Sequence, residues 1–169
     1  MTTLLSARYL MRASGGAIAG LAVLHTTLVA WVAWYLVEAA WSGAPPAASR
    51  TPLPPMTFTG AWIAAVVALL AMGPAVGVRA ARGAWDGTDP TATLPIGSGT
   101  RLLSAWLGSA AVLGVVALAP LPVYLALLEM GAFAPAAVPA PFVTHLAVIG
   151  LGPLPGIVVV LAGRGRAAS

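Results

Sequence analysis

The sequence contains no cysteine and no lysine. Without cysteine the chain has no disulfide, no thiolate metal site and no cysteine nucleophile. Charge of either sign is scarce, because eight arginines and four acidic residues make up only 7% of the 169 residues. A soluble domain carries about a quarter of its residues as charged side chains. This composition leaves no room for a soluble catalytic domain, and we predict that the chain is not an enzyme.

Charged residues are missing altogether from four long stretches. These are 13–37, 51–78, 102–128 and 130–163, and they are filled mainly by Ala, Val, Leu, Ile, Gly and Trp. A helix rises about 1.5 Å per residue, so roughly 20 apolar residues cross the hydrocarbon core of a bilayer. The sequence therefore predicts an all-α integral membrane protein, with residues 1–169 as a single membrane domain. The predicted transmembrane spans are 16–41, 58–78, 102–128 and 142–162, with a loop at 79–101.

The arginines are distributed unequally between the two sides of this predicted bundle. Arg50 lies on one side, and the other seven arginines lie on the opposite side. They are Arg8, Arg12, Arg79, Arg82, Arg101, Arg164 and Arg166. Since cytoplasmic loops keep the excess of Arg and Lys, we expect both termini and the loop 79–101 to be cytoplasmic, in a bacterial inner membrane. The net charge of +4 is thus explained by topology, and no nucleic-acid partner is expected.

Glycines recur at a spacing of four residues within three of the predicted spans. The pairs are Gly16 with Gly20, Gly73 with Gly77, and Gly152 with Gly156. This spacing places both members on one helix face and allows a second helix to approach closely. The pattern predicts tight helix packing, either within the chain or against a partner subunit.

Prolines lie inside the third and fourth predicted spans, at Pro120, Pro122, Pro153 and Pro155. Proline has no backbone N–H, so each one leaves a carbonyl of the preceding turn without its helical donor. At membrane depth such carbonyls need protein or water as neighbours. We expect the helices to be distorted there, either by packing or along a substrate path.

His25 and His145 are the only histidines, and both fall inside predicted spans. Ligation of one haem iron by both rings is the specific hypothesis. From their positions in the spans we expect the two rings to differ in depth by about 10 Å, which disfavours a shared iron. We predict no metal site and no cofactor on this chain, with a single haem or ligand contact at either histidine as the alternative.

The loop between the second and third spans carries the most specific motifs. Asp86-Gly87-Thr88, then Thr93-Leu94-Pro95-Ile96, then the run from Arg101 to Leu107 resemble the pattern of type-2 ABC exporter permeases. The later segment Leu118-Ala119-Pro120-Leu121-Pro122 is similar to the cytochrome c maturation permease, a haem-exporter-like branch. In that family a cytoplasmic helix docks on the ATPase subunit. The resemblance assigns this partner-binding role to Thr88, Asp89, Leu94 and Pro95.

The resemblance implies a permease subunit of an export complex, with an ATPase, other membrane subunits and the lipid bilayer as partners. Members of the family typically have six spans, so we expect a reduced permease, half of a split one, or a relative reused as an accessory subunit. The alternative function is a non-catalytic helical subunit of a larger respiratory or photosynthetic complex. A haem-binding electron-transfer subunit is the third hypothesis.

Overall fold

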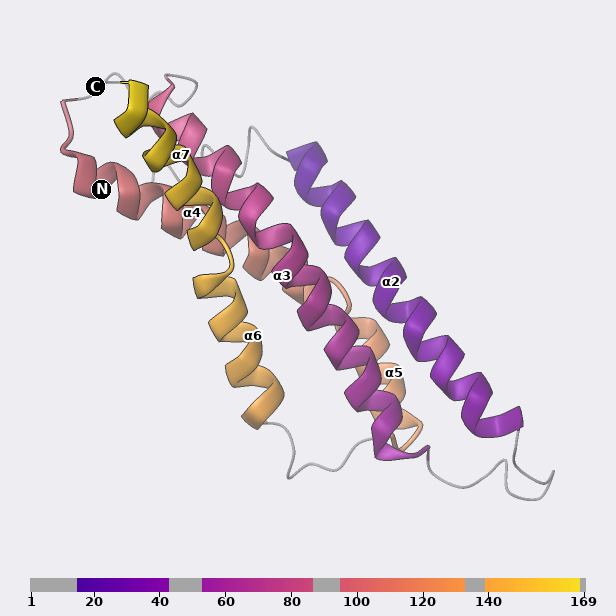
Figure 1. The fold of residues 1–169 in the computed structure, drawn as a ribbon. Coiled ribbons are helices and arrows are strands. Elements are labelled where there is room, and N and C mark those ends of the chain that lie inside the picture. Colours follow the sequence, from indigo (N-terminus) through magenta and orange to yellow (C-terminus); the bar gives the residue numbers. More distant parts are fainter. Residues whose placement is uncertain (1–14, 43–52, 87–94, 133–138, 168–169) are drawn as a thin grey trace.

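The computed structural model describes residues 15–42, 53–86, 95–132 and 139–167, and within these every regular element is a helix. The helices are α2 (Gly15–Ser42), α3 (Pro55–Trp85), α4 (Ser98–Leu118), α5 (Leu121–Glu129), α6 (Pro139–Leu151) and α7 (Leu154–Ala167) (Figure 1). Taking α4 with α5 and α6 with α7, the described chain has four stretches long and apolar enough to cross a membrane. The predicted all-α membrane fold with four spans is confirmed.

The helices extend beyond the predicted spans, most of all in α3. Helix α3 begins at Pro55 and continues to Trp85, so it extends past both ends of the predicted span 58–78. Arg79 and Arg82 end the apolar run of the sequence, but a charged side chain does not end a helix. The predicted spans 102–128 and 142–162 each correspond to two consecutive helices rather than one.

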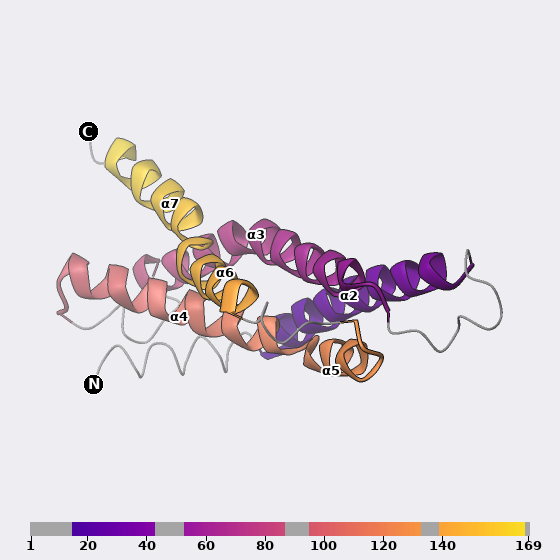
Figure 2. The same cartoon turned by 90° about the horizontal axis from the view of Figure 1, so that it is seen from below.

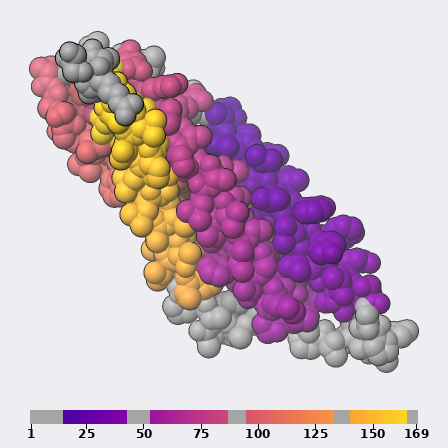
Figure 3. Space-filling model, viewed as in Figure 1, coloured from indigo at the N-terminus to yellow at the C-terminus, as the bar shows by residue number. Residues whose placement is uncertain are grey.

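Helix α3 is the central element of the bundle. It packs against all five of the other helices named above. Figure 3 shows α3 along the middle of one face, between α2 on one side and the pair α6 and α7 on the other. Apart from Thr57 and Leu69, every buried residue of α3 is alanine or glycine. Small side chains let the neighbouring backbones approach closely, which is how helices pack where no water drives them together.

Two of the four spans are interrupted at proline. Helix α4 ends at Leu118 and α5 starts at Leu121, so Pro120 lies between them. In the same way Pro153 lies between α6 and α7, and Figure 2 shows both spans as two coils in succession. The other two predicted sites of distortion, Pro122 and Pro155, lie in the first turn of α5 and α7. A helix tolerates proline there, because the first N–H groups have no helical partner.

Four of the six predicted packing glycines form one junction between α3 and the break in the last span. A Cβ atom added at Gly73 would lie 2.7 Å from the carbonyl oxygen of Gly152, and one at Gly77 would meet the carbonyl oxygen of Pro153. A Cβ atom at Gly156 would meet the carbonyl oxygen of Pro74. The glycines are required here because backbone faces backbone.

The remaining pair, Gly16 and Gly20, is not packed on any described part of the chain. A Cβ atom at either position would have no atom within 4 Å. Gly20 instead lines an open cleft between α2, α3 and α4. The same four-residue spacing therefore marks a helix contact in α3 but not in α2, since the spacing records which residues share a face and not what covers it.

Alanine substitution at Gly77, which is packed, and at Gly20, which is not, distinguishes the two environments. We expect Gly77→Ala to lower the free energy of unfolding by about 1–3 kcal/mol, because the backbone around Pro153 must move. Gly20→Ala should leave stability unchanged or raise it, since alanine favours a helix and the space is open. Thermal unfolding in detergent, followed by circular dichroism, measures both variants. Equal melting temperatures for the two would contradict the junction.

Candidate functional site

His25 joins three helices in the centre of the bundle. Its side chain is fully buried in α2. Its Nδ1 atom lies 2.9 Å from the carbonyl oxygen of Val116 in α4, and its Nε2 atom lies 3.2 Å from the carbonyl oxygen of Ala65 in α3. Both ring nitrogens therefore contact backbone oxygens of other helices.

The Val116 carbonyl is available to His25 because of Pro120. In a continuous helix the N–H of residue 120 would bond to this oxygen, but proline has none. The N–H of Ala119 reaches it at 3.2 Å, as a tighter turn. Ala65, by contrast, lies within the uninterrupted helix α3. The oxygen that lacks its normal donor is that of Val116, so the geometry assigns the N–H of a neutral His25 ring to Nδ1.

The second interrupted span is supported in a similar way by Trp106. The indole Nε1–H of Trp106 in α4 donates a hydrogen bond to the carbonyl oxygen of Gly150, at 2.7 Å. Gly150 is in the last turn of α6, where carbonyls have no donor within the helix. At each break, then, a side chain from a neighbouring helix bonds to a carbonyl of the turn before it.

His145 lies in a different environment from His25. Its Nδ1 atom accepts a hydrogen bond of 3.1 Å from the indole N–H of Trp62, and it also lies 3.0 Å from the carbonyl oxygen of Pro141. Its Nε2 atom is buried and has no partner among the described residues. His145 is therefore a partly buried ring with one nitrogen fixed and the other unpaired.

The two histidines are closer in depth than the predicted 10 Å. They lie against Ala65 and Trp62, which are separated by less than one turn of α3, about 4.5 Å of helix rise. The depth argument against a shared haem was therefore wrong. What separates the rings chemically is their bonding, because both nitrogens of His25 already face carbonyl oxygens. Among the described residues no group of three His, Asp or Glu side chains is placed to hold a metal ion.

The described arginines gather at one end of the bundle, formed by the end of α3, the start of α4 and the end of α7. Arg164 of α7 forms an ion pair with Asp86, the residue that follows α3. Arg101 of α4 donates hydrogen bonds to the carbonyl oxygens of Ala84, at 3.3 Å, and Ile96, at 3.4 Å. We call this the basic end, and it also contains Arg79 and Arg82 near the end of α3. The two described glutamates lie away from the basic end. Glu38 is near the end of α2, and Glu129 is the last residue of α5.

The predicted ATPase-binding residues belong to the connection at the basic end. Thr88, Asp89 and Leu94 lie outside the described residues. Pro95 is described and is exposed shortly before the start of α4. The ion pair of Asp86 and the hydrogen bonds of Arg101 hold the residues that flank this connection.

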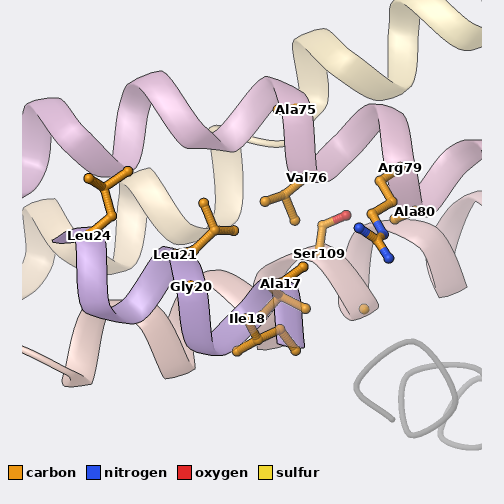
Figure 4. A pocket seen from close by; sticks show the side chains of 12 residues that line it. Ala17, Ile18, Gly20, Leu21, Leu24, Ala75, Val76, Arg79, Ala80 and Ser109 are labelled. Carbon is orange, nitrogen blue, oxygen red and sulfur yellow. The ribbon is translucent and has the colours of Figure 1, made fainter. Parts of the chain in front are cut away.

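An apolar cleft of about 470 Å³ opens between α2, α3 and α4 near the basic end. Figure 4 shows Leu21 and Val76 facing it from two helices, with Arg79 toward one end. The hydroxyl of Ser109, also in its wall, donates a hydrogen bond to the carbonyl oxygen of Ala105 at 2.7 Å. Among the described residues that line the cleft, Arg79 and Ser109 are the ones with a polar side chain, and Gly20 has no neighbour within 4 Å of an added Cβ atom there.

Sequence reasoning did not identify Trp62, Trp106 and Tyr124 as residues with polar side-chain atoms inside the bundle. Trp62 and Trp106 each donate to a partner in the last span, and Tyr124 has a buried hydroxyl. A signal was present, since a Trp or Tyr in an apolar span has one polar atom that needs a partner when buried. The sequence does not say which acceptor each one meets.

Comparison of the chain with protein-family models, with curated proteins and with solved structures gives no match. The function must therefore be argued from the residues and their arrangement. They establish an apolar membrane protein with four candidate spans.

Two substitutions of similar size test the role of His25. The amide nitrogen of Asn can take the place of Nδ1 and donate to Val116, whereas Leu cannot. We expect His25→Leu to be less stable than His25→Asn by about 1–2 kcal/mol, although leucine is the more apolar residue. Thermal unfolding in detergent compares the two directly. A leucine variant at least as stable as the asparagine variant would show that the Val116 carbonyl does not need this donor.

Proposed function

We propose that this chain is the membrane permease subunit of an ABC-type export complex, driven by a separate ATPase subunit. The proposal rests first on the resemblance of residues 86–107 to the permease pattern. It is compatible with the established architecture, a four-span apolar bundle. A permease of this kind needs no catalytic residues of its own, because ATP hydrolysis takes place on its partner.

The proposal depends mainly on one observation. The residues on both sides of the 87–94 connection are bonded to the helices of the bundle. Asp86, at its start, is paired with Arg164 of α7. Arg101, a few residues after its end, bonds to the carbonyl oxygens of Ala84 and Ile96. A force applied to the connection therefore acts on α3, α4 and α7 together. A coupling element between an ATPase and a membrane bundle requires this property.

The orientation of the chain in the membrane is inferred from the arginines of the basic end. Arg79, Arg82, Arg101, Arg164 and Arg166 are the arginines of the described helices, and all belong to the basic end. Positively charged residues are retained on the cytoplasmic side, so we infer that the basic end is cytoplasmic. This orientation places the connection where an ATPase can reach it.

Cysteine labelling tests the orientation without a background signal, because the chain has no cysteine. Ser42 ends α2 and Ser98 starts α4, and both are exposed at opposite ends of the bundle. A membrane-impermeant maleimide added outside intact cells should label Ser42→Cys but not Ser98→Cys. Permeabilised cells serve as the control, in which both variants should react. Labelling of Ser98→Cys alone in intact cells would reverse the orientation.

The coupling role is tested at Asp89 and Leu94. The sequence predicts a short helix starting at Pro90, for which Asp89 is the N-cap. Removing the cap in Asp89→Ala should cost about 0.5–2 kcal/mol of local helix stability and weaken the ATPase contact. Leu94→Asp should weaken it further by placing a charge at an apolar contact. Co-purification in mild detergent and the rate of ATP hydrolysis by the complex measure the effect.

Glu129→Ala provides the control for loss of an exposed carboxylate at the other end of the bundle. We expect this variant to keep its partners and its activity. If Asp89→Ala and Leu94→Asp also keep every native partner and full activity, the export function is contradicted. The non-catalytic accessory subunit would then be the better account of the chain.

A further inference from the structure

The cleft between α2, α3 and α4 combines an apolar wall with one cationic side chain. Its volume is about 470 Å³, and its wall consists mainly of Ala, Gly, Val, Leu and Ile. Of the two polar side chains in the wall, Ser109 already donates its hydroxyl proton to the carbonyl oxygen of Ala105. A molecule bound in this cleft would therefore meet the guanidinium of Arg79 as its polar contact.

Arg79 has no acidic partner in the described part of the chain. The ion pair that the described residues form at the basic end is that of Arg164 with Asp86. Asp86 is also the only acidic residue described at this end, where Arg82 and Arg101 lie as well. The basic end thus carries an excess of positive charge, and a negative charge beside Arg79 would be stabilised there.

The length of α3 places Arg79 near the boundary of the hydrocarbon core. The 31 residues of α3 extend over about 45 Å, which is about 15 Å more than the thickness of the core. If the helix is centred, about 8 Å of it projects at each end, and Arg79 lies about 9 Å before the last residue, Trp85. This is the level at which the phosphates of a bilayer give way to acyl chains.

The apolar part of the cleft continues from Arg79 toward the middle of the bilayer. Figure 4 shows Arg79 and Leu24 toward opposite ends of the cleft, with Leu21 and Val76 between them. On α2 the wall extends from Ala17 to Leu24, about 10 Å of helix rise. A cationic group at the bilayer surface followed by an apolar track has the polarity of a phospholipid, with its charged head and apolar tail.

We propose that this cleft binds one anionic phospholipid, such as phosphatidylglycerol, with an acyl chain along the cleft and its phosphate paired with Arg79. The planar guanidinium matches two phosphate oxygens at once. A zwitterionic lipid would bring a second cation to an end of the molecule that already has an excess of positive charge. The site lies within this chain and needs no ATPase, so its test is independent of the export function.

Native mass spectrometry of the purified full-length chain in detergent measures lipid binding directly. Phosphatidylglycerol and phosphatidylcholine with the same oleoyl chains are titrated in separate arms. Phosphatidylglycerol should saturate one site and bind about tenfold more tightly than phosphatidylcholine. Glycerol 3-phosphate, which has the phosphate without acyl chains, forms a third arm and should not bind. If it bound as tightly as the lipid, the site would belong to a free phosphate and the proposal would be overturned.

Two arginines of α3 separate a specific contact from general attraction by charge. Arg79→Gln should lower the affinity for phosphatidylglycerol about tenfold and abolish the preference over phosphatidylcholine. Arg82→Gln is the matched control, because Arg82 is exposed on the same helix but does not line the cleft. It should change the affinity by less than about twofold. Equal losses in the two variants, or no loss in Arg79→Gln, would contradict the site.

A second pair of variants tests the place of the acyl chain. A Cβ atom at Gly20, in the wall of the cleft, or at Gly114, outside it, would have no atom within 4 Å. Both leucine variants should therefore fold, and Gly20→Leu alone should weaken binding of both lipids, by about tenfold. Unchanged binding in Gly20→Leu would overturn the proposal.

The same spectra identify the other molecules that could occupy the cleft. A dimer of the chain that dissociates in Gly20→Leu would assign the cleft to a second copy. Lipid binding that appears only after removal of residues 1–14 would assign it to the N-terminal segment of the chain itself. Either result, or the absence of saturable phosphatidylglycerol binding, overturns the lipid site.

Discussion

A backbone carbonyl in the hydrocarbon region of a bilayer has no water to bond to, so each break in a transmembrane helix must be repaired by another part of the protein. This chain breaks two of its four spans, at Pro120 and at Pro153. His25 bonds to the carbonyl of Val116 before the first break, and Trp106 bonds to that of Gly150 before the second. These two bonds join α2 to α4 and α4 to α6, around the alanine- and glycine-rich surface of α3.

The same arrangement gives the two histidines opposite roles. Both rings lie against α3, less than one turn apart, and their contacts assign the proton of a neutral ring to Nδ1 in His25 and to Nε2 in His145. His25 contacts carbonyl oxygens of two neighbouring helices, and His145 keeps a buried Nε2 atom without a partner among the described residues. At the basic end, the Asp86–Arg164 pair and the Arg101 hydrogen bonds hold the flanks of the 87–94 connection to the bundle.

The sequence predicted the all-α class and four candidate spans, because long charge-free apolar stretches indicate both. It located the two breaks, since proline cannot donate, but it did not say that Pro122 and Pro155 would fall harmlessly in first turns. It also did not separate Gly77 from Gly20, whose spacing is equal and whose neighbours differ. The depths of the two histidines were misjudged, because they depend on how α2 and α6 pack on α3. The partners of Trp62, Trp106 and Tyr124 depend on the same long-range packing and cannot be deduced from local sequence.

The hydrogen bond from His25 to Val116 is the central claim, and ¹⁵N NMR of histidine tests it most directly. Because the chain has only two histidines, labelling this residue type gives a simple spectrum, and a His145→Asn sample assigns it. Protonated and unprotonated ring nitrogens differ in ¹⁵N chemical shift. We predict a protonated Nδ1 in His25, and in His145 a protonated Nε2 with an unprotonated Nδ1. An unprotonated Nδ1 in His25 could not donate to the Val116 carbonyl and would contradict the account.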